Sequence, residues 1–336
     1  MRLAATLRAM ACVAGMAALA DASGALPEAC VDIAEDRARL ACYDRAMGRK
    51  PADVPRAIEE PEPPAPPRPS LLSHIWDLDR SDDGERFTLR PHQTNYLLPF
   101  RYTSDTNGRP SSPVSGAAGG ARPSPAEVKF RLSIKTRLAE KLFDGRLDLW
   151  VAYTQQAHWQ LFLDSGPFRE INHEPELMAL YRLDRNLFGA DLRFVNVGLS
   201  HHSNGRGDAG SRSWNRIYAQ LGLDYGEHVA VLIRPWLRLG DLERVDTNPD
   251  ISRYYGHGDI AAFYRNGGHA VGLTLRSALS VKEPRGAAQF DWYFPLYRQV
   301  KGYLQVFSGY GESLIDYNHR QNTIGLGIAL VDWLER

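Results

Sequence analysis

From about residue 84 to its end, the chain consists of short segments in which large apolar residues alternate with small or polar ones. Gly, Pro, Asn or Asp bounds each segment, and long stretches of helical periodicity are absent. Successive side chains of a strand point to opposite faces, so the alternation predicts a series of β-strands, each with one apolar face. The predicted strands are 128–139, 147–155, 178–184, 194–204, 213–223, 229–239, 270–279, 289–296, 303–309 and 323–331.

The first twenty residues have a different pattern. Arg2 and Arg8 precede the apolar stretch 10–20, and Ala18-Leu19-Ala20 before Asp21 fits the small-x-small pattern of a cleavage site. Residues 1–20 are therefore predicted to be a secretory signal peptide, with cleavage after Ala22 as an alternative. A buried Ala-rich helix is the alternative interpretation of the same stretch.

Three further regions are expected after the signal peptide. Residues 21–50 form a small segment of helical character that holds Cys30 and Cys42, and two cysteines in an exported chain predict one disulfide. Residues 51–70 are dense in proline and predict an extended, semi-rigid linker. Residues 71–336 contain all the predicted strands.

Composition and charge narrow the class of protein. The 336 residues carry 40 basic and 40 acidic side chains, and this balance argues against nucleic acid as a partner. The sequence has no stretch of about 18 apolar residues after the N-terminus, so it does not predict a transmembrane helix.

An exported all-β chain can be a soluble sandwich or a membrane barrel. Aromatic residues near the predicted strand ends favour an antiparallel transmembrane β-barrel, because such residues form girdles at the membrane interfaces. Polar residues on the opposite strand faces suit a hydrated barrel interior. A soluble sandwich remains an alternative, because periodicity alone does not separate the two. The aromatic residues are Trp150, Tyr153, Trp159, Trp214, Tyr218, Trp236, Trp292, Tyr293, Tyr303 and Trp333.

The stretch 201–215 carries the candidate chemistry. His201 and Ser203 share a strand face with the apolar residues 195, 197 and 199, and Asn215 lies on the apolar face of the next predicted strand. If 194–204 and 213–223 are neighbouring antiparallel strands, these three side chains can form a Ser–His–Asn series of nucleophile, base and orienter. A pair of polar residues at the point where a strand leaves the membrane is the alternative interpretation. His202 faces the other way and is expected in the interior.

Five blocks of sequence occur in consistent order along the chain: 153–160, 167–170, 201–216, 248–251 and 308–318. Over residues 85–336, these blocks resemble the outer membrane phospholipase A family. The resemblance implies a twelve-stranded barrel in the bacterial outer membrane that hydrolyses acyl esters of phospholipids and lysophospholipids, requires Ca²⁺ and is active as a homodimer. Carried over by position, Ser203 is the nucleophile, His201 the general base, Asn215 the orienter, and the Gly205 backbone N–H an oxyanion donor.

The resemblance also implies calcium ligands. The Arg206 carbonyl and the Ser211 hydroxyl match ligand positions, and Asp208 is a nearby loop carboxylate. Ser165 matches the ligand that the second subunit contributes, and Gln155 matches an interface glutamine. An aspartate of the family is replaced here by Thr247, and Asp246 is the candidate substitute.

A neutral Asn as third member fits a requirement for a cation. An Asn can fix the imidazole tautomer, but it brings no charge to stabilise an imidazolium, and a bound cation can stabilise the oxyanion instead. Two other functions remain open: a non-catalytic barrel (pore or scaffold) that keeps the family sequence, and a soluble periplasmic esterase.

Overall fold

The computed structural model of the chain describes residues 30–49, 70–79, 86–118, 122–240, 246–278, 283–298 and 300–330. The expected signal peptide and all but the last residue of the expected linker lie outside these ranges. The chain divides into two compact units, Met1–Pro66 and Pro67–Arg336. Within the described ranges, none of the helices is long and apolar enough to cross a membrane.

The first unit contains a short helix and a disulfide. Helix α1 (Asp36–Ala46) has Asp36 in its first turn and Arg45 in its last, so both charges interact favourably with the helix dipole. Cys30 and Cys42 are bonded to each other, which confirms the expected disulfide. The bond closes a short loop onto a helix with no buried residues, in a segment too small to form a core of its own.

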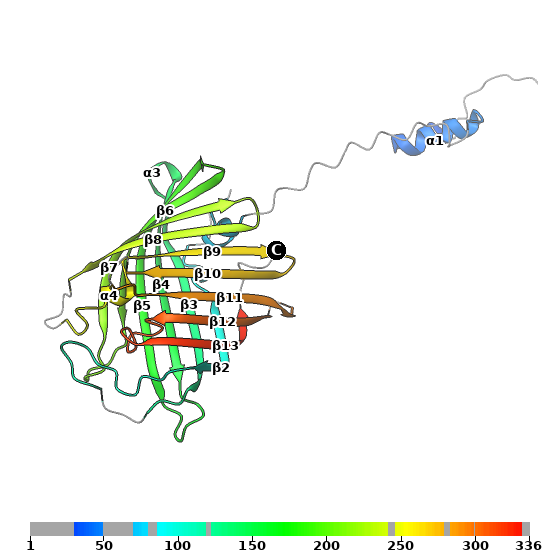
Figure 1. Ribbon diagram of the computed structural model, residues 1–336. Helices are drawn as coiled ribbons and strands as arrows, with labels where there is room; N and C mark the ends of the chain where they lie inside the picture. The colour runs from blue at the N-terminus through cyan, green and yellow to red at the C-terminus, as the bar shows by residue number, and fades with distance from the viewer. Residues whose placement is uncertain are drawn as a thin grey trace, which may run out of the picture. The chain divides into compact units, whose positions relative to one another are not determined.

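The second unit is a closed antiparallel β-barrel (Figure 1). Strands β2 to β13 pair in chain order, and the β3–β4 and β13–β2 pairings close the ring, which confirms the expected twelve-stranded barrel. A two-residue strand, β1, adds to the edge of β3. The bounds are β1 (Arg90–Pro91), β2 (Asn95–Thr103), β3 (Ala126–Lys141), β4 (Leu147–Trp159), β5 (Phe168–Leu187), β6 (Ala190–Ser203), β7 (Ser213–Tyr225), β8 (Val229–Leu239), β9 (Gly258–Asn266), β10 (His269–Ser277), β11 (Gly286–Tyr297), β12 (Val300–Tyr310) and β13 (Arg320–Leu330); the short helices are α2 (Leu71–Trp76), α3 (Leu142–Gly145) and α4 (Ser252–Tyr255).

Ten of these strands correspond to predicted segments, whereas β2 and β9 were not among them. The register of β2 shifts between Leu98 and Arg101, so this strand does not keep the strict alternation that marks the others. Strand β9 (sequence GDIAAFYRN) mixes small and polar residues on both faces and carries only a weak pattern.

The connections divide the barrel into two ends. The links β5–β6, β7–β8, β9–β10 and β11–β12 are tight turns, whereas the links β2–β3, β4–β5, β6–β7, β8–β9, β10–β11 and β12–β13 are longer loops. We refer to these as the short-turn end and the long-loop end. Antiparallel pairing places all the longer loops at one end of the barrel.

The strand faces separate by polarity. On β6 the outward Val197 and Leu199 are each 47% exposed, whereas the inward Asn196 and Ser200 are buried. An apolar outside with a polar inside is the reverse of a soluble fold and is the arrangement of a barrel in lipid. The alternative of a soluble sandwich is therefore wrong.

The expected aromatic girdle is mostly wrong. Trp333 lies outside the described residues, and six of the other nine aromatic residues are buried, because they share the inward parity of their strands with the polar side chains. Several of these rings pack against buried cations. For example, the Arg216 guanidinium lies over the rings of Trp214 and Trp236. These rings help to fill the interior. The six are Trp150, Trp214, Tyr218, Trp236, Tyr293 and Tyr303.

Helix α2 (Leu71–Trp76) fills the short-turn end of the barrel. Ser70 caps it by accepting a hydrogen bond from the Ser73 backbone N–H, and Leu71, Leu72 and Trp76 are buried in the core. The Trp76 ring packs edge-on against Trp150 and lies 3.4 Å from the Lys135 ammonium. A cation over an indole face is an attractive contact that holds the helix in place.

Candidate active site

The candidate site lies on the outer face of β6 and β7, at the long-loop end. The two strands pair antiparallel, with His201 opposite Asn215 and Ser203 opposite Ser213. This register confirms the predicted pairing of residues 194–204 with residues 213–223. His201, Ser203 and Asn215 are all partly exposed and share the face of Leu199, which points away from the barrel interior.

His201 and Asn215 are in contact. The Nδ1 atom of His201 lies 2.7 Å from the Asn215 Oδ1 atom, so the imidazole donates through Nδ1–H and its Nε2 is left to act as a base. Ser203 lies two residues further along the same face, and among the described residues its hydroxyl makes no hydrogen bond. The structure thus brings His201 and Asn215 into contact, and places the Ser203 hydroxyl beside them without a hydrogen bond to the imidazole.

The loop after Ser203 is shaped by Asn204, a residue that the sequence reasoning missed. Its Oδ1 accepts hydrogen bonds from the backbone N–H groups of Arg212 (3.0 Å) and Arg206 (3.4 Å), and its Nδ2 donates to the Gly210 carbonyl (2.8 Å). Gly205 follows with φ of +64°, a conformation that glycine adopts at little cost. The loop is therefore held closed directly beside the candidate nucleophile.

A second missed residue, Glu170, supports Asn204 from inside the barrel mouth. The Glu170 Oε2 atom accepts a hydrogen bond from Asn204 Nδ2 at 3.3 Å, and Oε1 accepts from Asn172 Nδ2 at 2.6 Å and from the Ile315 backbone N–H at 3.1 Å. The loop between β12 and β13 thus folds into the mouth and connects to the candidate site. This gives the 308–318 block its structural role, and neither contact could be found from strand periodicity.

Two of the expected calcium ligands lie in the same loop. The Arg206 carbonyl and the Ser211 hydroxyl accept no hydrogen bond from any described residue, so both oxygens are available to a hard cation such as Ca²⁺. Asp208, also in the loop, pairs with the Arg206 guanidinium at 3.0 Å. Hydrogen bonds from this guanidinium and from the Gly210 backbone N–H hold the pKa of Asp208 below its usual value, so the carboxylate stays ionised.

The loop before β9 packs against the start of β7. The Ser213 backbone N–H donates to Thr247 Oγ1 and to Asn248 Oδ1. Asp246 instead pairs with Arg238 at 2.6 Å and accepts from the Asn248 backbone N–H. Both of its oxygens are thus engaged within the loop.

The two residues expected at a subunit interface lie elsewhere on the long-loop end. Ser165 is exposed in the β4–β5 loop with φ of +65°, and Gln155 lies on β4 opposite His173 of β5. In the described part of the chain, no group of three or more His, Cys, Asp or Glu side chains could hold a metal ion. The expected ligands are the Arg206 carbonyl, the hydroxyls of Ser211 and Ser165 and the single carboxylate of Asp246, so they do not form such a group.

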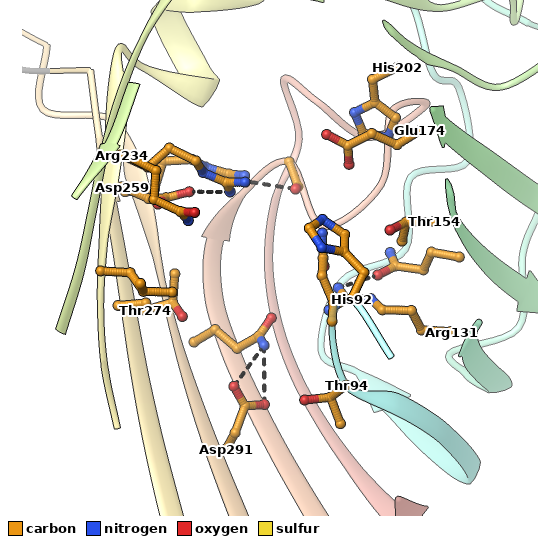
Figure 2. Close-up of a pocket in the computed structure, with 18 of the residues that line it drawn as sticks. His92, Thr94, Arg131, Thr154, Glu174, His202, Arg234, Asp259, Thr274 and Asp291 are labelled. Atoms are coloured by element: carbon orange, nitrogen blue, oxygen red, sulfur yellow. Dashed lines mark hydrogen bonds and ion pairs between the residues drawn. The ribbon is translucent and has the colours of Figure 1, made fainter. Parts of the chain in front are cut away.

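The barrel interior holds a cavity of about 300 Å³ lined by paired charges (Figure 2). Arg234 pairs with Asp259 at 2.7 Å, and Arg216 pairs with Glu174. His202 lines this cavity beside Glu174, as the parity of β6 predicted, and its Nδ1 accepts a hydrogen bond from the Trp214 indole. These charges compensate one another inside the barrel, and the outer-face site is separated from them by the strand itself.

Comparisons with known proteins agree with this description. The family model for phospholipase A1 matches residues 72–330. A phospholipase A1 of Escherichia coli strain K12 is 39% identical over 248 residues, which cover 73% of this chain and 82% of the relative. Two solved structures superpose with 34% identity, each covering 79% of this chain and 98% of the other. One is a Salmonella typhi outer membrane phospholipase dimer with bound calcium (TM-score 0.67), and one is an E. coli outer membrane phospholipase A in which an active-site asparagine is replaced by alanine (TM-score 0.67).

A closed barrel with an apolar outside and an ion-paired interior defines an integral β-barrel of the bacterial outer membrane, and the solved relatives are outer-membrane proteins. The chain belongs to the phospholipase A1 family, whose members are lipid-hydrolysing esterases. Barrels of this class have short turns on the periplasmic side and longer loops outside the cell. The candidate site therefore lies near the outer leaflet.

Proposed function

We propose that the protein hydrolyses acyl esters of phospholipids and lysophospholipids with a Ser203–His201–Asn215 triad on the outer face of the barrel, in a calcium-dependent reaction. The observation that carries the proposal is the contact between His201 and Asn215 on a membrane-facing surface. His201 is two residues from Ser203 on the same strand face. A structural barrel has no need for an oriented imidazole beside a serine at the lipid boundary.

The reaction follows from these positions. The Ser203 hydroxyl attacks the carbonyl carbon of the ester while His201 Nε2 takes its proton, and the Gly205 backbone N–H donates to the oxyanion that forms. Collapse breaks the bond to the glycerol oxygen, which takes the proton from His201. Water then attacks the acyl carbon while His201 Nε2 takes one of its protons. The bond from that carbon to Ser203 Oγ breaks, Oγ takes the proton back from His201, and the fatty acid leaves.

The Asn215 side chain holds the tautomer of His201 but carries no charge. An Asp in this position would stabilise the imidazolium by its full negative charge, whereas an amide oxygen contributes only a dipole. This difference supports the need for a cation near the site.

The residues of the 204–212 loop fit a calcium ion. We assign the Arg206 carbonyl and the Ser211 hydroxyl as ligands, with Ser165 of the partner subunit and water completing the oxygen set. When bound, calcium stabilises negative charge on the acyl oxygen, which is worth several kcal/mol. Asp246 can serve as a calcium ligand only when its ion pair with Arg238 is broken, because that pair engages its carboxylate.

A homodimer is the active form in this proposal. Gln155 on β4 and Ser165 in the β4–β5 loop lie toward the same, long-loop end of the barrel as Ser203, and the apolar outer face offers a surface for a second copy. The Salmonella typhi relative is a dimer with bound calcium, which supports the assignment.

The test is fatty-acid release from mixed phospholipid–detergent micelles by the wild type, Ser203→Ala and Ser308→Ala, each with calcium or with chelator. Ser308 is a matched control, since it occupies the outward face near the long-loop end of β12 and its hydroxyl donates to Asn322. We expect Ser203→Ala to be inactive, Ser308→Ala to match the wild type, and chelator to abolish release. Release that survives in Ser203→Ala would refute the triad and leave the non-catalytic barrel as the alternative.

A further inference from the structure

His173 lies beside Ser203 and has no role in the chemistry described above. It occupies the outward face of β5, directly opposite Ser203 on β6, and is partly exposed. Side chains that face each other in this way have Cβ atoms about 4.5–5.5 Å apart. The imidazole is thus at the level of the nucleophile along the membrane normal.

The orientation of the ring is fixed by Tyr153. The His173 Nδ1 atom lies 2.7 Å from the Tyr153 hydroxyl, and the two rings stack with centroids 6.2 Å apart. The phenol has one proton, and Gln155 Oε1 at 3.3 Å competes for it with His173 Nδ1 at 2.7 Å. The shorter contact favours donation to Nδ1, so the neutral imidazole carries its proton on Nε2; an imidazolium carries protons on both nitrogens. In either state, Nε2–H is a hydrogen-bond donor.

The Nε2 edge of the ring faces the loop after Ser203. A Cβ atom added to Gly205 would lie 3.9 Å from His173 Nε2 and 3.8 Å from Cδ2, so the imidazole edge packs beside the Gly205 backbone. Among the described residues, neither the Gly205 backbone N–H nor His173 Nε2 has a hydrogen-bond partner. Two donors therefore lie next to each other, both beside the candidate nucleophile.

We propose that His173 Nε2–H is a second donor of the oxyanion hole, together with the Gly205 backbone N–H. When Ser203 Oγ bonds to the acyl carbon, the carbonyl π bond becomes a negatively charged C–O single bond, and both donors stabilise that oxygen. His201 takes the serine proton and passes it to the glycerol oxygen, whereas His173 keeps its own proton. This inference rests on the proposed serine mechanism and makes His173 a catalytic residue in it.

Three variants separate this role from a structural one. His173→Phe keeps a flat ring but removes the donor, and we expect kcat to fall about 10²- to 10³-fold, with KM unchanged, because that is the usual loss for one oxyanion donor. His173→Gln keeps an N–H at a similar distance from the backbone, and we expect it to recover most of the kcat. The control His269→Phe removes an exposed imidazole that stacks on Trp292, and it should leave kcat and KM unchanged.

The assay uses the full-length protein in mixed micelles with saturating calcium, and crosslinking measures the dimer in every sample. Full kcat in His173→Phe, or a loss that appears only as raised KM or as lost dimer, overturns the inference. Equal losses in the Gln and Phe variants also overturn it, because the donor is then not what matters. Ser203→Ala is measured in parallel. If Ser203→Ala is inactive while His173→Phe is fully active, this inference fails alone; if Ser203→Ala is active, the proposed function fails.

Discussion

Replacing Asn215 with alanine tests how the site is held together. The side chain makes a 2.7 Å hydrogen bond to His201 Nδ1 and lies on an outward, partly exposed face. Its loss leaves no cavity in the core, so the barrel should fold normally. The imidazole, however, loses the partner that fixes its tautomer and its ring plane.

The expected size of the effect follows from that one bond. A neutral hydrogen bond contributes about 0.5–1.5 kcal/mol, and one to a charged group about 1.5–3 kcal/mol. His201 is charged only after it has taken the serine proton, so the bond is stronger in the transition state than in the ground state. The rate falls only by the difference between the two, about 1–1.5 kcal/mol. At 1.36 kcal/mol per tenfold change in rate, Asn215→Ala should lower kcat by about 5- to 13-fold, with little change in KM.

The assay is initial-rate fatty-acid release, with Asn322→Ala as control and Asn215→Asp as a second variant. Asn322 lies on the outward face of β13, and its Oδ1 accepts a hydrogen bond from Ser308 far from the site, so its loss should not change kcat. Asn215→Asp restores an acceptor and should recover most of the wild-type kcat. A wild-type kcat in Asn215→Ala would refute the reasoning, as would an Asn215→Asp variant no better than alanine.

Three further outcomes are expected. Asn204→Ala removes the side chain that closes the 204–212 loop, so kcat should fall at least tenfold and hydrogen exchange should rise in that loop alone. Unchanged exchange would contradict the positioning role of Asn204. Ser211→Ala should raise the calcium concentration for half-maximal activity about tenfold without changing kcat at saturation, and an unchanged calcium titration would remove Ser211 from the ligand set. Trp76→Ala removes a buried ring from the helix that fills the short-turn end and should lower the free energy of unfolding by about 3–5 kcal/mol. Activity of this variant at low temperature should match the wild type, since Trp76 lies inside the barrel.

The sequence predicted those features that depend on strand parity. A period of two decides which side chains leave the barrel, and so His201, Ser203 and Asn215 could be placed on one face before any coordinates were known. The same rule placed His202 in the interior, where the structure has it. The pairing of β6 with β7 followed because a single loop joins them.

Features that depend on distant loops could not be predicted in this way. Glu170 and Ile315 meet across 145 positions of the chain, and only the folding of the β12–β13 loop into the barrel mouth brings them together. The aromatic residues were misplaced for a different reason: closeness to a strand end does not say whether a ring faces lipid or the interior, whereas strand parity does. Trp214 and Tyr218 share the parity of the inward Arg216, and they are buried.

The central claim is that Ser203, on the outside of the barrel, is the nucleophile. The most direct measurement is mass spectrometry of the protein after inactivation with a long-chain alkyl fluorophosphonate in micelles containing calcium. We expect a single adduct on Ser203, formed at the rate at which activity is lost, and no adduct in Ser203→Ala. An adduct on any other residue, or inactivation with Ser203 unmodified, would contradict the claim.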